Sequence, residues 1–573
     1  MKRILIIASG AFLFLAITVP FVMALVSPAY IGPKLEAKLR QETGLELRLP
    51  KQPRLRLFPS LELQIVNAAL LSEQGEIIAQ LPDIRIAPTW AELFQHEIES
   101  GSIRLLGPEF YVPYHSKQAG LAAANRQPKA LSFGVQIEDG EIIFEDVTAQ
   151  SQMRFTQMNG TLNLKDGLSF MGGLSFATHR LFVQAHVLDM GRLYENGSPM
   201  DISLHSGQLH FSFSGLAQLA RGFALAGQAE IETADLYEFA DGFDIKTPLP
   251  RTALRFAASG AFSAEPGEIR FSNGNYQIQG MPARGDLSLK ALAANYALQG
   301  RLGFDRLQLD SLASMAYVAG LQGKLAIAAR EIKYHGLTTG TALLDIQFAN
   351  EAIEFAFKKI ALGQGQAQGN LKLNSANPQR RKFAMELSLT KADAQQSLGF
   401  LFGIRDLQGD VDLKLTAISE GENAQDMLSR LVGAGSVKLS TGHIQDVDLS
   451  ALIKAVNEKI MDGWAPVRGR KSEIKNLQAD FQLTDGVARS QNFTLENDAF
   501  SASGRVNVDF LREYLDMQLD VFKQDGSKLL PVSLMAEGQF THPKFYPNMP
   551  GVLNNPQLAY QAMRAMNMET PQP

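Results

Sequence analysis

Period-two alternation of apolar and polar residues is the feature that most limits how this chain can fold. From Phe500 to Phe510 every second residue is apolar or small, and the residues between them are polar. Such alternation is typical of a β-strand with one dry face and one wet face. The pattern recurs along most of the 573 residues, for example at 208–215, 253–262, 353–359 and 409–416. Each of these dry faces needs something apolar to cover it.

Turns and helices limit how the strands can be connected. Glycine, asparagine or aspartate turns separate most of the alternating segments, and few long helical patterns lie between them. This indicates a mainly β, antiparallel fold rather than repeated βαβ units. Amphipathic helices are predicted over 394–404, 424–433 and 448–461. Two arrangements would bury the dry faces: two sheets packed as a sandwich, or one long sheet curled into a gutter that holds an apolar ligand.

The N-terminus carries a targeting signal. Lys2 and Arg3 precede an uncharged apolar run of 23 residues, Ile4–Val26, which as a helix is about 35 Å long and crosses a bilayer core of about 30 Å. A cleaved signal peptide usually has a shorter apolar region, and Pro28 stands where its cleavage site would lie. We therefore predict an uncleaved, single-pass anchor in a bacterial inner membrane. The residues assigned to the membrane include Ile4, Phe12, Phe14, Phe21 and Val26.

Charge and composition exclude several classes of function. The positive charges of the anchor stay in the cytoplasm, so the bulk of the chain is predicted to lie in the periplasm. The net charge is −5 and no basic block occurs. The chain therefore lacks the positively charged patch that binding to nucleic-acid phosphates requires. The chain has no cysteine, which excludes disulfides and thiolate metal sites.

No catalytic motif stands out either. The glycine-rich segment 363–370 lacks the Lys-Ser/Thr pair of a phosphate-binding loop. His205 and His210 have no acidic residues at metal-ligand spacing. Glu141 and Glu145 are interpreted as solvated charges at the rim of a strand. We therefore predict a protein that is not an enzyme and that has no cofactor and no metal site.

The C-terminal part carries a family resemblance. Segment 407–453 has the order strand pair, short helix, glycine-bounded strand and an Asp-Leu dipeptide leading into a helix. Further along, the spacing of glycine, valine and proline fits as well: Gly486, Val487, Gly504, Pro531, Val532, Gly538, Pro543 and Pro547. Near the N-terminus, an anchor is followed by a helix ending in "ETG" and by "FPSLELQIVNAAL". With these features the chain resembles the AsmA family.

The resemblance implies a fold and a function. AsmA-like proteins are inner-membrane-anchored periplasmic proteins of outer-membrane biogenesis, and they look like bridge-type lipid carriers. We therefore expect an elongated, curled antiparallel β-sheet that forms a groove, with a few amphipathic helices, preceded by one N-terminal transmembrane helix. The expected domains are an anchor (1–27), an N-terminal helix and β region (28–114), a linker or loop (115–130), a β-groove middle region (131–390), an AsmA-like C-terminal domain (391–549) and a loose tail (550–573).

The expected activity is the carriage of phospholipid acyl chains between the inner and outer membranes. Partners would be phospholipids, the inner membrane and other envelope proteins. The alternative is a non-catalytic scaffold or assembly factor that offers strand edges to outer-membrane proteins. The residues predicted to line the groove come from the clearest alternating strands: Val411, Leu413, Leu415, Phe481, Leu483, Ala502, Val506, Val508, Leu515, Met517 and Leu519.

Overall fold

The computed structural model describes most residues between 45 and 548. Outside the described residues lie 1–31, 90–101, 115–133, 243–252, 311–320, 452–470, 549–573 and shorter segments in several loops. The predicted anchor, the predicted linker, the predicted tail and most of the helix predicted over 448–461 therefore fall outside them. Among the residues that are described, no helix has both the length and the apolar character needed to cross a membrane.

The chain divides into two compact units. The first unit comprises residues 1–247, 251–280 and 288–290, and the second comprises 248–250, 281–287 and 291–573. The boundary runs through strand β16 (Met281–Ala291). The domain bounds given above remain predictions.

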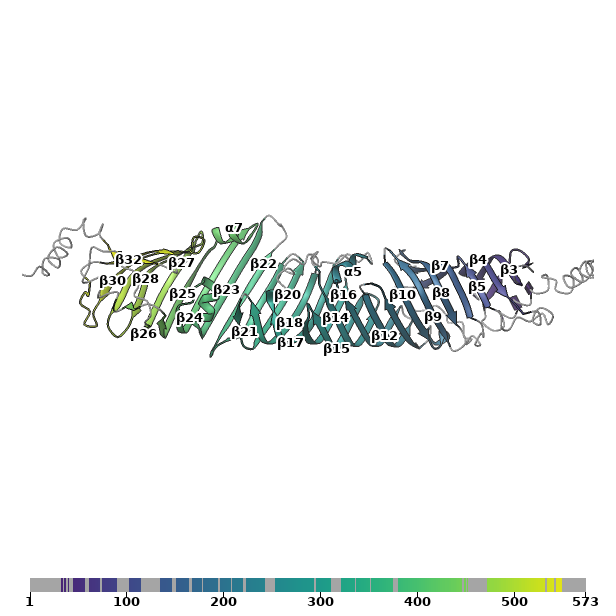
Figure 1. The fold of residues 1–573 in the computed structure, drawn as a ribbon, viewed down its shortest axis with the longest axis horizontal. Helices are drawn as coiled ribbons and strands as arrows, with labels where there is room; N and C mark the ends of the chain where they lie inside the picture. Colours follow the sequence, from purple (N-terminus) through teal and green to yellow (C-terminus); the bar gives the residue numbers. More distant parts are fainter. Residues whose placement is uncertain are drawn as a thin grey trace, which may run out of the picture. The chain divides into compact units, whose positions relative to one another are not determined.

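The first unit is a sheet of mostly consecutive antiparallel strands (Figure 1). Two short helices, α4 (Met190–Leu193) and α5 (Leu236–Gly242), interrupt it. Its strands are β1 (Glu46–Arg48), β2 (Arg54–Arg56), β3 (Glu62–Leu71), β4 (Ile77–Ala87), β5 (Ser102–Leu106), β6 (Glu109–Tyr114), β7 (Gly134–Asp146), β8 (Ser151–Asn163), β9 (Leu168–Phe176), β10 (His179–Val187), β11 (Ser198–His205), β12 (Leu209–Gln218), β13 (Ala224–Thr233), β14 (Phe256–Glu265) and β15 (Glu268–Ile278).

The second unit follows the same plan. Helices α6 (Ala394–Phe402) and α7 (Ala424–Ser429) flank β24. The strands are β17 (Tyr296–Gln308), β18 (Leu321–Tyr334), β19 (Leu337–Thr338), β20 (Ala342–Asn350), β21 (Ala352–Leu362), β22 (Gly365–Asn374), β23 (Arg381–Asp393), β24 (Leu407–Gly421), β25 (Val432–Ile444), β26 (Ser472–Ile474), β27 (Asn476–Thr484), β28 (Val487–Glu496), β29 (Ser501–Asp509), β30 (Tyr514–Phe522), β31 (Leu534–Gln539) and β32 (Lys544–Pro547).

The mainly β fold and the helices near 394 and 424 are confirmed. Helix α7 is shorter than predicted because the chain enters β25 at Val432. Among the strand pairings that are described, the expectation of an antiparallel sheet is correct for most but wrong for three: β5–β7, β6–β7 and β17–β18 are parallel. Parallel neighbours need a connection of about a dozen residues or more, which brings the chain back to the same end of the sheet. Residues 309–320 provide such a connection between β17 and β18.

The strands carry the bulges and glycines that bend a sheet. Gly160 in β8 faces Gly172 in β9, and a Cβ on either residue would collide with the backbone of the other strand. Glycine pairs of this kind let two strands approach and fold toward one face. At bulges, an amide that the ladder leaves unpaired donates to a neighbouring side chain. Examples are Asp139 N–H to Asn159 Oδ1 at 3.0 Å and Lys391 N–H to Asp412 Oδ1 at 2.8 Å.

Candidate functional site

The first unit has one apolar sheet face, which runs over strands β9 to β15. In the strand register Leu204 lies opposite Phe211, Phe211 opposite Ile231, and Ile231 opposite Ala258. Residues between these positions, such as Ser212 and Glu230, point to the other face and form its polar surface. The predicted separation into a dry face and a wet face is therefore present in this unit.

Much of this apolar face is only half-buried. Residues of a closed hydrophobic core are almost completely shielded from water, whereas many large side chains here are not. The half-buried residues are Phe170, Phe176, Met200, Ile202, Leu204, Phe211, Ile231, Phe256 and Phe271. They form a continuous apolar surface that an apolar ligand would shield further.

On this face, two aromatic rings meet across an intervening strand. Phe211 in β12 and Phe262 in β14 have ring centroids 6.3 Å apart in an edge-on arrangement, although β13 lies between these strands. Strands two positions apart are separated by about 9–10 Å in a flat sheet. Gly227 of β13 faces Phe262 and leaves room for the rings.

A second half-buried apolar surface covers strands β20 to β23 in the second unit. In the register, Ile346 lies opposite Phe355, Phe355 opposite Leu371, and Leu371 opposite Met385. Its half-buried members are Ile346, Phe348, Phe355, Phe357, Leu371, Leu373, Phe383 and Met385. We refer to this set as the open surface of the second unit. None of these residues was among those predicted to line the groove.

The residues that were predicted to line the groove lie on the same sheet face, further along the second unit. The register places all eleven on it: β24 carries three, β27 two, β29 three and β30 three. Six are buried, namely Val411, Leu413, Leu415, Leu483, Ala502 and Leu519. Five are half-buried, namely Phe481, Val506, Val508, Leu515 and Met517. Their assignment to a lipid path remains a prediction.

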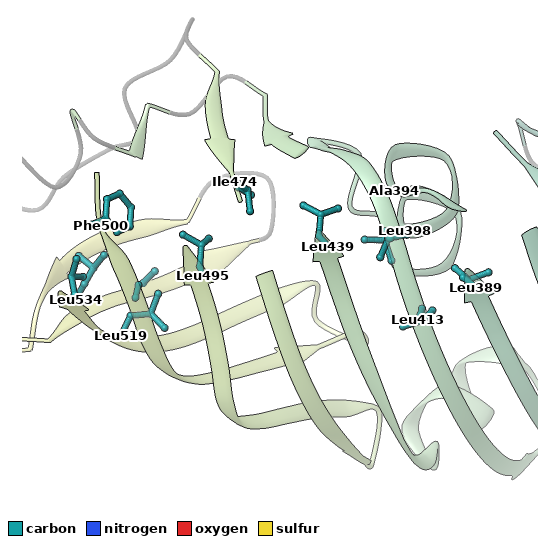
Figure 2. Close-up of a cluster of buried hydrophobic side chains, with 14 of the residues drawn as sticks. Leu389, Ala394, Leu398, Leu413, Leu439, Ile474, Leu495, Phe500, Leu519 and Leu534 are labelled. Atoms are coloured by element: carbon teal, nitrogen blue, oxygen red, sulfur yellow. The ribbon is translucent and has the colours of Figure 1, made fainter. Parts of the chain in front are cut away.

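Helix α6 covers part of this set. Ala394 and Leu398 of the helix are buried in one cluster with Val411, Leu413 and Leu439 of the sheet. Figure 2 shows Leu398 beside Leu439 and above Leu413. Leu413 is only 1% exposed as a result. We refer to the buried part of this face beneath α6, with Val411, Leu413 and Leu439, as the covered surface of the second unit.

Charged groups lie on the opposite, wet face. The Asp345 carboxylate lies 3.0 Å from Lys324 Nζ and 2.8 Å from Lys358 Nζ. Hydrogen bonds from Lys358 and then Lys324 lower the pKa of Asp345. Such pairs make this side of the sheet polar, in contrast to the apolar side.

The histidine pair noted in the sequence comes together on this wet side of the first unit. His205 and His210 lie opposite each other in the β11–β12 hairpin, with their Nδ1 atoms 3.0 Å apart. Ser203 Oγ lies 2.8 Å from His205 Nε2. Over the part of the chain that the structure describes, no group of three or more histidine, aspartate or glutamate side chains is arranged to hold a metal ion.

Comparison with known protein families finds a similarity for the N-terminal part. The model of the AsmA family matches residues 1–121. This part of the chain is similar to the AsmA family. The resemblance inferred from the sequence is therefore confirmed over these residues, which include the predicted anchor and strands β1 to β6. No curated protein and no solved structure matches the chain.

Proposed function

We propose that this AsmA-like chain is a non-catalytic carrier of phospholipids between the inner and outer membranes of a bacterial envelope, anchored in the inner membrane by residues 1–27. Acyl chains lie along the apolar sheet faces, and headgroups stay in water. The single observation that carries the proposal is the half-buried apolar face, present in both units and backed by a polar face. The AsmA match over residues 1–121 supports the placement in the envelope.

The energetics favour an apolar path. Each CH₂ removed from water contributes about 0.8 kcal/mol, so a phospholipid with two long chains does not cross water unaided. A row of half-buried phenylalanine, leucine and isoleucine side chains lowers this barrier along its whole length. An acyl chain that covers these side chains also removes them from water, which is favourable. No bond is made or broken in this process, so the proposal needs no catalytic group.

Photo-crosslinking in living cells tests the proposal. A photoreactive amino acid would replace Ile231 in the first unit or Leu371 in the second, both of which lie on the half-buried apolar faces. The neighbouring Glu230 and Lys372 point to the wet faces and serve as matched controls. We expect phospholipid adducts at Ile231 and Leu371 and none at the controls.

The same experiment separates the alternative. A scaffold for outer-membrane proteins would give protein adducts, and these would concentrate at strand edges rather than on the apolar faces. Adducts that form only within the chain at both positions would mean that the faces close into an ordinary core, and the carrier proposal would be rejected.

A further inference from the structure

Helix α6 lies on the apolar face of the second unit and covers part of it. It connects β23 to β24, which are neighbours in the sheet, so the chain does not need a helix here to reach the next strand. Asp393 caps its start, with Oδ1 accepting from Gln396 N–H at 2.8 Å, and Gly403 ends it in the left-handed conformation at φ 76°. The helix thus has sharp ends and is a separate element lying on the sheet.

Two aromatic contacts tie the end of this helix to distant parts of the sheet. Phe400 meets Tyr334 of β18 edge-on at 5.5 Å, and Phe402 stacks on Phe510, just after β29, at 5.3 Å. Eight strands lie between β18 and β29 in the order of pairing: β20, β21, β22, β23, β24, β25, β27 and β28. The sheet is therefore curled and staggered so that both flanks reach one nine-residue helix.

The helix lies where two surfaces of different exposure meet, and its Phe402 packs against the same cluster as Phe383 and Met385 of the open surface. The residues of the open surface on β20 to β23 are half-buried, whereas Val411 and Leu413 of the covered surface are almost inaccessible. Phe400 and Ile404, at the end of α6, are 39% and 37% exposed. Exposing large apolar side chains to water is unfavourable. These two exposed side chains lie next to the covered surface.

We propose that α6 is a gate in the acyl path: its Phe402–Phe510 stack holds it over the covered surface, and lipid chains reach Leu413 only when this stack opens. The inference rests on the function proposed above and adds a regulated step to it. Opening separates Phe402 from Phe510 and lifts Leu398 from the sheet, and it exposes the same kind of surface that the open side already presents. An acyl chain that enters takes the place of the helix.

A reversible cross-link tests the gate in the full-length chain. The protein has no native cysteine, so Phe402→Cys with Phe510→Cys can be joined by a short, reducible thiol-specific reagent. A reagent is preferable to a disulfide because stacked rings leave their Cβ atoms further apart than a disulfide requires. The matched control joins Ile418→Cys to Val432→Cys, which lie opposite each other on the wet face of β24 and β25 and are 60% and 45% exposed.

Lipid adducts are then measured with a small diazirine amino acid at Leu413, below the gate, or at Leu371, on the open surface. We expect adducts at Leu371 in every state. At Leu413 we expect adducts in the reduced protein and in the cross-linked wet-face control, and a loss of adducts when positions 402 and 510 are joined. Without the two cysteines, Phe402→Ala should raise the yield of lipid adducts at position 413 by about two- to twelvefold. This is the change in the opening equilibrium that the loss of one aromatic pair would cause.

Three results would overturn the inference. Adducts at Leu413 in the cross-linked chain would show that α6 does not bar the path. Adducts at Leu371 but never at Leu413 would make α6 a fixed cover of an ordinary core, while the carrier function would stand. Adducts at neither position would reject the lipid path itself, and the gate with it.

Discussion

Gly215 of β12 and Gly227 of β13 face each other directly in the first unit, and neither position has room for a Cβ. An added Cβ at Gly227 would collide with the carbonyl oxygen of Ser214, and one at Gly215 with that of Ala226. Both glycines lie on the apolar face, in the row between Phe213 and Leu225. With no side chain at Gly227, the rings of Phe211 and Phe262 meet across β13 on this face, with their centroids 6.3 Å apart.

We therefore expect Gly227→Val to destabilise the first unit. Overpacking of a tight site typically costs about 1–3 kcal/mol, and here the clash is with backbone, which cannot rotate away. The urea midpoint of unfolding should fall accordingly. Gly207→Ala is the matched control, because nothing lies within 4 Å of a Cβ at that position. Equal midpoints for the two variants would contradict the role assigned to the glycine pair.

Asn497 is expected to be a stability determinant of the second unit. Its buried side chain accepts hydrogen bonds from Ala499 N–H and Phe500 N–H, both at 2.8 Å, in the turn between β28 and β29. Asn497→Ala leaves these donors without their acceptor, which costs about 1–3 kcal/mol. Asn497→Asp keeps the acceptor oxygen and should retain more of the stability. The free energy of unfolding of both variants checks this, and a milder effect of alanine than of aspartate would disprove it.

The second unit should lose a small part of its stability in acid through Asp345. Lys358 and Lys324 lower the pKa of this carboxyl in the folded state. A depressed pKa stabilises the fold above the pKa of the unfolded chain, and this contribution disappears as the pH falls through the folded value. Since the lysines are largely solvent-exposed, the effect should be about 1 kcal/mol or less and should shrink in high salt.

The measurement is the difference in urea midpoint between neutral and acidic pH, for the native chain and for Asp345→Asn. The variant should show a smaller difference because it cannot be protonated. An identical pH dependence of the two proteins would mean that Asp345 does not contribute.

A charge on the open surface should abolish lipid carriage without unfolding the protein. Phe355→Asp puts a carboxylate on the half-buried apolar face. An acyl chain that binds there would have to strip the water from this carboxylate, which is energetically costly. Because this side chain is only half-buried, the folded state should survive. The matched control is Gln347→Asp, on the exposed wet face of β20.

Lipid adducts at Leu371 and resistance of the cells to detergents provide the two readouts, and circular dichroism checks the fold. We expect both readouts to fall only for Phe355→Asp. A folded Phe355→Asp protein with full adduct yield would argue against the apolar path and in favour of a scaffold.

The alternating pattern determined which face of each strand is dry, because successive side chains of an extended chain must point to opposite sides. Leu413, Leu483 and Val506 could therefore be placed on one face without coordinates. The helix beginning at residue 394 was also predicted from the sequence, because the segment 394–404 carries an apolar stripe. These features depend only on residues close in sequence.

Tertiary structure alone decided which dry faces are covered. Leu371 and Leu413 occur in the same kind of alternating strand, yet the first is half-buried and the second is 1% exposed. The difference arises because α6 returns over β24, while β22 has no such cover among the described residues. The parallel pairing of β17 with β18 also depends on long-range structure, because the connection between them must return the chain to the end of the sheet at which β17 began. Long-range contacts of this kind leave no periodic trace in the sequence. Six of the eleven residues predicted to line the groove are therefore found buried, whereas the open surface was recognised only in the structure.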